Sequence, residues 1–244
     1  MSALTADALD PALYYAVRQA EGRTYSDEVV ALLPRAGPGV AHRDEWRIRQ
    51  ASALRLEEYF RRQSKPLSIL DLGCGNGWMA ARMGRLPKCK VWGFDTNRPE
   101  LTQAGRVFRQ RGLGFVEGDI ERLPFLDGAL DSVVIASSIQ YFPDLVGMVR
   151  GLLERLSGRG EIHILDSPLY EDLEVAGARE RSQEYYARLG FPQMAPHYYH
   201  HTWSSLQDFE VTILYDPRTL LSRLRGRFRS VEAPFPWIRI REKP

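Results

Sequence analysis

Residues 68–80 combine an acidic strand end with a loop in which glycine stands at alternate positions. The segment reads Ser-Ile-Leu-Asp-Leu-Gly-Cys-Gly-Asn-Gly-Trp-Met-Ala, so an apolar run precedes the loop and a helix is expected to follow it. Glycine permits close backbone approaches that a Cβ would block. Loop N–H groups and a helix N-terminus together favour a negatively charged ligand group. The pattern therefore predicts a ligand site beyond the carboxyl end of a parallel strand.

The glycine spacing narrows the class of ligand. Dinucleotide-binding enzymes use G-x-G-x-x-G, but here the glycines are Gly73, Gly75 and Gly77, and Trp78 occupies the position of the third dinucleotide glycine. The pattern D-x-G-x-G-x-G resembles the first motif of the class I methyltransferases that use S-adenosylmethionine. A dinucleotide oxidoreductase is therefore the weaker interpretation.

Acidic residues follow the next two predicted strands. Asp95 ends a strand about twenty residues beyond the loop, where a carboxylate accepts hydrogen bonds from ribose hydroxyls. The alternative for Asp95 is a helix N-cap, because Asn97 and Pro99 follow it. Asp119 follows the next strand, and an isolated aspartate there is also an ordinary turn residue.

The resemblance assigns roles to these positions. It implies that the loop and Asp71 hold the methionine part of S-adenosylmethionine, that Asp95 holds the ribose, and that Asp119 and the Ile120 N–H meet the adenine. Many relatives carry histidine where Gln140 stands, so this chain lacks one candidate base. The expected cofactor-binding residues are Asp71, Gly73, Cys74, Gly75, Asn76, Gly77, Asp95, Thr96, Asp119, Ile120 and Ser137.

Strands alternate with helices from residue 67 onward, which is typical of a parallel sheet. We expect an α/β fold with a Rossmann-like, mostly parallel seven-stranded sheet, helices on both faces and an antiparallel last strand. The first five strands are predicted at 68–72, 90–94, 114–117, 132–136 and 161–165, and the intervening helices at 78–84, 99–111 and 143–156.

The chain is expected to form a single domain with additions at both ends of its core. Residues 1–66 are predicted to be an N-terminal helical cap, 67–166 the cofactor-binding core, 167–215 a lid insertion, and 216–244 a C-terminal helix with a closing hairpin. The helix would start at Asp216-Pro217, and the hairpin would pair segments 229–233 and 237–241.

The segment 197–203 is rich in histidine and aromatic residues and follows two prolines. We expect no metal site, because this run contains no Cys, Asp or Glu to complete a zinc ligand set. His200 and His201 are the candidate catalytic residues, which would orient an acceptor or take its proton. The alternative is a plain packing loop. Aromatic residues in both the cap and the insertion favour an organic small-molecule acceptor.

Length and composition agree with an ordinary α/β domain. The chain has 244 residues, 44% hydrophobic content, a net charge of +2 and two cysteines. These values predict a cytoplasmic protein with no nucleic-acid or membrane partner, and they leave the oligomeric state open. The predicted function is methyl transfer from S-adenosylmethionine to an O, N or C atom of a small molecule. Alternatives are a protein or RNA methyltransferase and a non-catalytic S-adenosylmethionine-binding protein.

Overall fold

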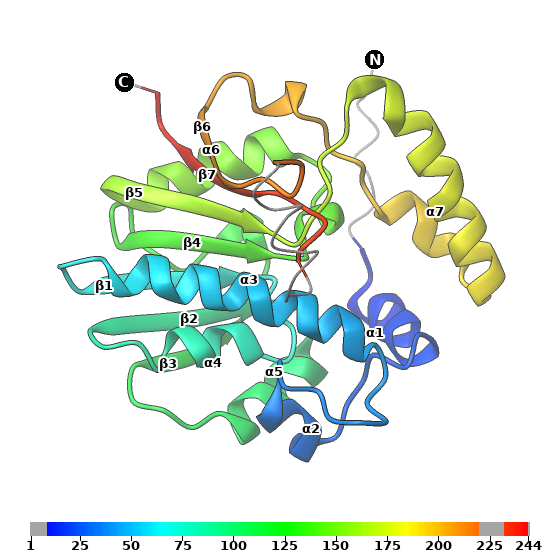
Figure 1. Ribbon diagram of the computed structural model, residues 1–244, viewed down its shortest axis with the longest axis horizontal. Helices are drawn as coiled ribbons and strands as arrows, with labels where there is room; N and C mark the ends of the chain where they lie inside the picture. The colour runs from blue at the N-terminus through cyan, green and yellow to red at the C-terminus, as the bar shows by residue number, and fades with distance from the viewer. Residues whose placement is uncertain (1–8, 220–231, 244) are drawn as a thin grey trace.

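The computed structural model describes residues 9–219 and 232–243 of the chain (Figure 1). The helices are α1 Pro11–Ala20, α2 Asp27–Leu32, α3 Arg43–Arg61, α4 Trp78–Met83, α5 Arg98–Val107, α6 Leu145–Arg155 and α7 Val175–Leu189. Short 3-10 turns are η1 Ile120–Arg122, η2 Ile139–Tyr141, η3 Asp172–Glu174, η4 Pro192–His197 and η5 Ser204–Leu206. None of the helices in these described ranges is long and apolar enough to cross a lipid bilayer.

Within the described residues, seven strands form one sheet in the order β3-β2-β1-β4-β5-β7-β6. The strands are β1 Leu67–Leu72, β2 Cys89–Asp95, β3 Leu113–Glu117, β4 Leu130–Ala136, β5 Leu156–Leu165, β6 Glu210–Tyr215 and β7 Trp237–Arg241. The first five pair in parallel, whereas β7 runs antiparallel to both β5 and β6. The predicted mostly parallel sheet with an antiparallel last strand is confirmed.

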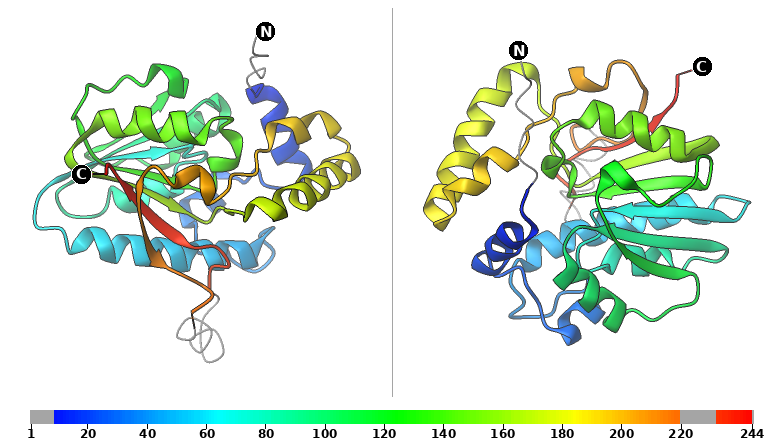
Figure 2. Two further views of the ribbon diagram at one scale, coloured as in Figure 1. Left: turned by 90° about the horizontal axis from the view of Figure 1, so that it is seen from above. Right: turned by 180° about the vertical axis from the view of Figure 1, so that it is seen from behind.

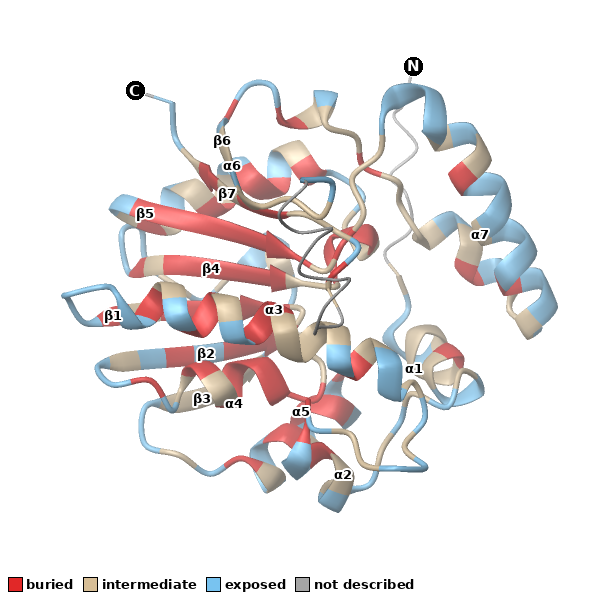
Figure 3. Cartoon of the chain, viewed as in Figure 1, coloured by how far each residue is buried: buried red, intermediate tan, exposed pale blue. Residues whose placement is uncertain are grey.

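The central strands are buried because helices cover both faces of the sheet (Figures 2 and 3). On one face, Trp46 and Leu56 of α3 and Met83 of α4 join the same apolar core as Ile69. On the other face, Leu152 of α6 packs in a second core with strand residues. Parallel strands that are buried on both sides need near-continuous apolar sequence, which β1 and β4 provide.

A third, smaller core lies beyond the carboxyl ends of the strands. Helices α1 and α7 stand side by side at this edge of the molecule, past the arrowheads of β4 and β5 (Figures 1 and 2). Val17 of α1, Tyr186 of α7 and Met194 of η4 form its buried centre. The predicted N-terminal cap and the segment after β5 therefore meet over the edge where the ligand is expected. The lid function of the latter segment stays a prediction.

The C-terminal part differs from the predicted hairpin. Strand β7, predicted as one half of the hairpin, pairs with β5 on one side and β6 on the other. The other predicted half, residues 229–233, lies mostly outside the described part of the chain. Strand β6, the antiparallel neighbour of β7, belongs to the sheet although the predicted insertion, residues 167–215, includes it. Residues 220–231, which contain most of the predicted C-terminal helix, lie outside the described part of the chain.

Gly77 brings α4 close to its neighbours. It has a φ of 76°, and a Cβ at this position would lie 2.5 Å from Phe115 Cε1 and 2.7 Å from Ala104 Cβ. We expect Gly77→Ala to lower the free energy of unfolding by about 2 kcal/mol or more, because it adds overpacking to left-handed strain. The measurement is urea denaturation.

Gly105→Ala is the matched control. Gly105 lies in α5, and a Cβ there would meet nothing within 4 Å. Alanine is a better helix former than glycine by about 0.8–1.0 kcal/mol, so this variant should be more stable than the wild type. Equal stability of the wild type and Gly77→Ala would contradict the close packing of α4, α5 and β3.

Candidate cofactor site

The glycine loop is joined to the end of the neighbouring strand by backbone hydrogen bonds. Leu72 pairs with Phe94 in the parallel register of β1 and β2. Beyond this pair, the N–H groups of Gly73 and Cys74 both donate to the Phe94 carbonyl, at 2.8 and 3.2 Å. The loop after β1 and the residues after β2 therefore lie together at the carboxyl edge, as the sequence predicts.

Asp95 connects three parts of this edge. Its Oδ2 accepts from the Gly75 N–H at 2.7 Å, and its Oδ1 accepts from the Asn97 N–H at 2.8 Å. Its carbonyl accepts from the Gly118 N–H of the next loop at 3.1 Å. The N-cap of α5 is Asn97, whose Oδ1 accepts from the Glu100 N–H. Asn97, and not Asp95, is therefore the N-cap of α5. The ribose role of Asp95 stays a prediction.

The remaining predicted cofactor residues lie at the same edge with different burial. Asp119 is exposed, and its Oδ1 accepts from the Glu121 N–H at 3.1 Å as a cap of η1. Ile120 is half-buried and Thr96 is exposed. Asn76 is buried, and its Oδ1 has no protein hydrogen-bond partner.

The ends of β4 and β5 carry unusual backbone conformations. Ser137 and Asp166 have φ values of 58° and 50°, in the left-handed region that non-glycine residues rarely adopt. The Ser137 N–H donates to the Leu165 carbonyl at 3.0 Å, and Gln140 Nε2 donates to the Ser137 carbonyl at 2.8 Å. Such strain persists only where surrounding contacts enforce it, and it is concentrated at functional sites.

Three carboxyl groups surround the loop. Burial, against a hydrogen bond from the Ala80 backbone and with a smaller contribution from the Asp95 carboxylate, raises the pKa of Asp71 to about 7. Burial also raises the pKa of Asp95, although the N–H groups of Asn97 and Gly75 offset part of this effect. Burial raises the pKa of Glu100 to about 7, and Arg18 counteracts it. All three carboxyls, after burial itself, raise the pKa of the Cys74 thiol between them.

This arrangement favours a cationic or donor-rich ligand. The N–H groups of Gly73, Cys74, Gly75 and Gly77 are already engaged within the protein, so they do not form the open anion site that the sequence predicts. Asp71 Oδ2 and Glu100 Oε2 are buried acceptors with no protein partner. A pyrophosphate would be repelled here, whereas an ammonium, a sulfonium or a hydroxyl would satisfy these oxygens.

Sequence reasoning missed several residues of this site. Arg18 of α1 lies with its Nη2 3.8 Å from Glu100 Oε1. Tyr14, one turn earlier on α1, packs edge-on against Tyr141 of η2 with ring centroids 5.2 Å apart. One signal was present in the sequence: Glu100 and Ala104 are four residues apart, so a charged residue lies on the buried face of α5.

The two candidate histidines have different surroundings. His201 is buried, and its Nε2 is 3.0 Å from the Ile139 carbonyl. This hydrogen bond connects the segment 197–203 to η2. His200 is half-buried, with Nε2 2.9 Å from Ser182 Oγ and its ring beside Tyr170 and Tyr198. Burial lowers the pKa of both imidazoles, which favours their neutral forms at pH 7.

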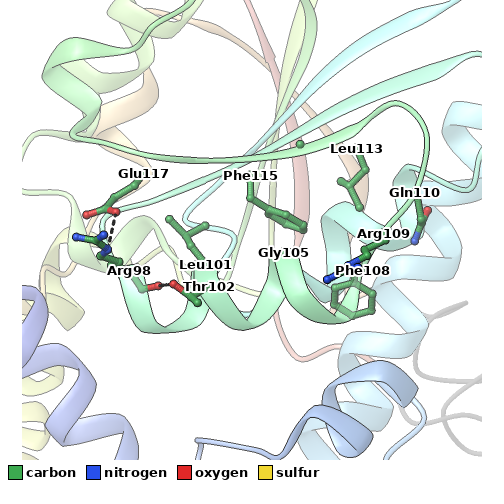
Figure 4. Close-up of a pocket in the computed structure, with 11 residues that line it drawn as sticks. Arg98, Leu101, Thr102, Gly105, Phe108, Arg109, Gln110, Leu113, Phe115 and Glu117 are labelled. Carbon is green, nitrogen blue, oxygen red and sulfur yellow. Dashed lines mark hydrogen bonds and ion pairs between the residues drawn. The ribbon is translucent and has the colours of Figure 1, made fainter.

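Two cavities in the described part of the chain lie away from the loop. One, of about 700 Å³, follows the edge strand β3 and the outer side of α5 (Figure 4). Its apolar lining includes Leu101, Phe108 and Phe115. The other, of about 640 Å³, is near the amino ends of β1 and β4. Neither cavity is lined by a residue of the glycine loop, so the site is defined by its polar groups.

Comparison with known proteins indicates the kind of domain that contains this loop. A family model described as a methyltransferase domain matches residues 69–160, which contain the glycine loop, Asp95 and Asp119. Residues 69–160 therefore resemble a class I methyltransferase domain. This confirms the family resemblance of the glycine loop and the strand-end acids.

Curated relatives of the methyltransferase domain match about half of this chain. A demethylmenaquinone methyltransferase of Thermus thermophilus is 37% identical over 126 residues, covering 50% of this chain and 54% of the relative. A sterol 24-C-methyltransferase of Eremothecium gossypii is 25% identical over 126 residues, covering 50% of this chain and 34% of that protein. The chain therefore spans about half of the first relative's length and a third of the second's.

A solved structure extends the likeness of fold beyond the methyltransferase domain. Geranyl diphosphate C-methyltransferase of Streptomyces coelicolor was solved with Mg²⁺, geranyl diphosphate and S-adenosyl-L-homocysteine. It matches with a TM-score of 0.57 and 14% identity, and the match covers 93% of this chain and 96% of that one. At this identity the match shows a common fold.

The raised pKa of Asp71 predicts a stability cost in the ligand-free protein. An unfolded aspartate titrates near pH 4, so the folded protein binds more protons between about pH 4 and 7 and loses stability as pH rises through that window. Asp71→Asn removes the buried charge and keeps an acceptor oxygen. We expect its melting temperature to exceed that of the wild type at pH 8, with a smaller gain at pH 5.

Asp131→Asn is the control of opposite sign. Asp131 accepts from the Ser68 N–H and from Lys65 Nζ, both at 2.9 Å, and its pKa is lowered from its usual value by Lys65 and the Ser68 N–H in spite of partial burial. This variant should lose stability at both pH values. A lower melting temperature for Asp71→Asn at pH 8 would contradict an uncompensated carboxylate at the loop.

Proposed function

We propose that this chain transfers a methyl group from S-adenosylmethionine to a small organic molecule. The observation that carries the proposal is the group of three carboxyls with raised pKa values around the glycine loop of a methyltransferase domain. Two of them, Asp71 and Glu100, each have an unpartnered acceptor oxygen that fits the hydrogen-bond donors and the positive charge of this cofactor. A dinucleotide would place its pyrophosphate against the same carboxyls.

In this proposal the strand-end residues hold successive parts of the cofactor. Asp71 and the loop take the methionine portion, Asp95 the ribose hydroxyls, and Asp119 with the Ile120 N–H the adenine. The bound cofactor supplies a methyl group that its sulfonium already activates. The protein therefore mainly has to align the acceptor, and alignment alone can lower a barrier by roughly 7–11 kcal/mol.

The acceptor would lie between α1, η2 and the inserted segment. Tyr14 and Tyr141 are in ring contact, and Tyr141 in turn contacts Tyr198 with centroids 5.9 Å apart. These rings come from three separate parts of the chain and provide apolar surface with phenol groups. The names of the relatives specify demethylmenaquinone and sterols, which are largely apolar molecules. We propose an acceptor with a substantial apolar part for this chain as well.

Of the two candidate histidines, His200 is better placed for chemistry. His201 already contacts a backbone carbonyl with its Nε2, whereas His200 contacts a hydroxyl and lies in the row of aromatic rings. A neutral imidazole there could take the proton of a hydroxyl acceptor. We assign His200 as the candidate base and His201 as a positioning residue for η2.

We also propose a cytoplasmic location and no nucleic-acid partner for this protein. The cysteines Cys74 and Cys89 are both unpaired, which suits a reducing compartment such as the cytoplasm. The net charge of +2 gives no support for a nucleic-acid partner.

Calorimetry with S-adenosylhomocysteine tests the cofactor assignment. Asp95→Ala removes the proposed ribose acceptor and the partner of the Gly75 N–H, so we expect affinity to fall at least tenfold, which is about 1.4 kcal/mol. Asp208→Ala is the control, because Asp208 is exposed and pairs only loosely with Arg150 at 3.4 Å. NADH is the competing ligand.

Two results would contradict the assignment. One is unchanged affinity of a folded Asp95→Ala protein, with folding checked by thermal denaturation. The other is tight binding of NADH by a wild-type protein that does not bind S-adenosylhomocysteine.

A further inference from the structure

Glu100 is a buried acid to which no part of the cofactor has been assigned. It lies in the first turn of α5 with 5% of its surface exposed, and its N–H is fixed by Asn97 Oδ1 at 3.1 Å. Its carboxyl faces the glycine loop: a methyl group added to Gly75 would lie 3.4 Å from Glu100 Oε2. That oxygen has no protein hydrogen-bond partner.

Charged groups from several elements face this carboxyl. Arg18 and Tyr14 approach from α1, Arg49 from α3, Asp95 from the end of β2 and Cys74 from the loop. After burial, which is the largest effect, Arg18 and Arg49 lower the pKa of Glu100 and Asp95 raises it, and the resulting value of about 7 leaves both protonation states accessible near neutral pH. A neighbouring positive charge would favour the ionised form.

A purely structural role accounts poorly for this geometry. A buried carboxylate that stabilises a fold normally has its oxygens hydrogen-bonded to donors. Glu100 instead has one orphaned oxygen, and its nearest guanidinium nitrogen, Arg18 Nη2, lies 3.8 Å away, beyond hydrogen-bond distance. The carboxyl is therefore held beside the loop without being satisfied by the protein.

We propose that Glu100 makes the cofactor site selective for charge, so that its carboxylate beside Gly75 favours the sulfonium cofactor over the neutral thioether product. This inference rests on the proposed function. Methyl transfer moves CH₃⁺ from sulfur to the acceptor, and the sulfur keeps the electron pair of the broken bond and becomes neutral. Glu100 then loses its electrostatic attraction to the bound molecule, which weakens product binding and favours exchange.

The experiment compares two ligands that differ in this charge. Dissociation constants of S-adenosylmethionine and S-adenosylhomocysteine are measured by calorimetry at pH 6 and pH 8 for the wild type and Glu100→Gln. At pH 8, we expect Glu100→Gln to weaken S-adenosylmethionine binding about tenfold, or about 1.4 kcal/mol. Binding of S-adenosylhomocysteine should change by less than about twofold. At pH 6, where Glu100 is largely protonated, the two proteins should differ less.

Two further variants make the result specific. Glu58→Gln is the control, because Glu58 is an exposed acid of α3 that pairs with Arg62. It should leave both affinities unchanged. Glu100→Asp keeps the charge and should retain the preference for the sulfonium ligand at pH 8. It also provides the test if Glu100→Gln does not fold.

Equal weakening of both ligands by Glu100→Gln would overturn the inference, because it would make Glu100 a positioning residue of the loop. Unchanged affinities for both ligands would overturn it as well. In either case the wild type still binds both molecules and the proposed function stands. A wild-type protein that binds neither ligand would refute the proposed function together with this inference.

Discussion

The hydrogen bond from the Gly75 N–H to the Asp95 carboxylate links the loops at the carboxyl ends of the parallel strands, where the ligand is expected to bind. It joins the loop after β1 to the end of β2 at 2.7 Å, while the Asp95 carbonyl reaches the Gly118 N–H after β3. Parallel strands place these three connections at one edge, and Asp95 together with the Phe94 carbonyl fixes their relative positions. Both oxygens of this carboxylate are hydrogen-bonded within the protein, so the connection holds without a ligand.

The unsatisfied carboxyls of the site lower the stability of the ligand-free protein. Asp71 and Glu100 add two more carboxyls with raised pKa values and orphaned oxygens within a compact volume. A sequence selected for stability alone would replace such groups with amides or apolar side chains. Their presence is understandable if binding requires negative potential at the loop, and the stability lost there is offset by the two large apolar cores on either side of the sheet.

The sequence predicts features that short segments encode. The loop between β1 and α4, the acid at the end of β2 and the five parallel strands all follow from local spacing and apolar runs. The role of Arg18 could not be predicted in this way, because Arg18 becomes unusual only when α1 approaches α5. Glu100 stands out in the sequence only as a charged residue on the buried face of α5. The partner of β7 was also beyond local patterns, since β6 lies more than twenty residues earlier along the chain.

The third core has a consequence for how fast molecules reach the glycine loop. It contains three fully buried residues, Val17, Tyr186 and Met194, whereas each sheet core contains many more. Contacts of this kind open locally at a free energy well below that of global unfolding. Amide hydrogens of α1 and α7 should therefore exchange with solvent long before those of β1 and β4. Because α1 and α7 pack in a core of their own, they can open locally and expose the glycine loop. Strands β1 and β2, which carry Asp71 and Asp95, stay paired during this opening.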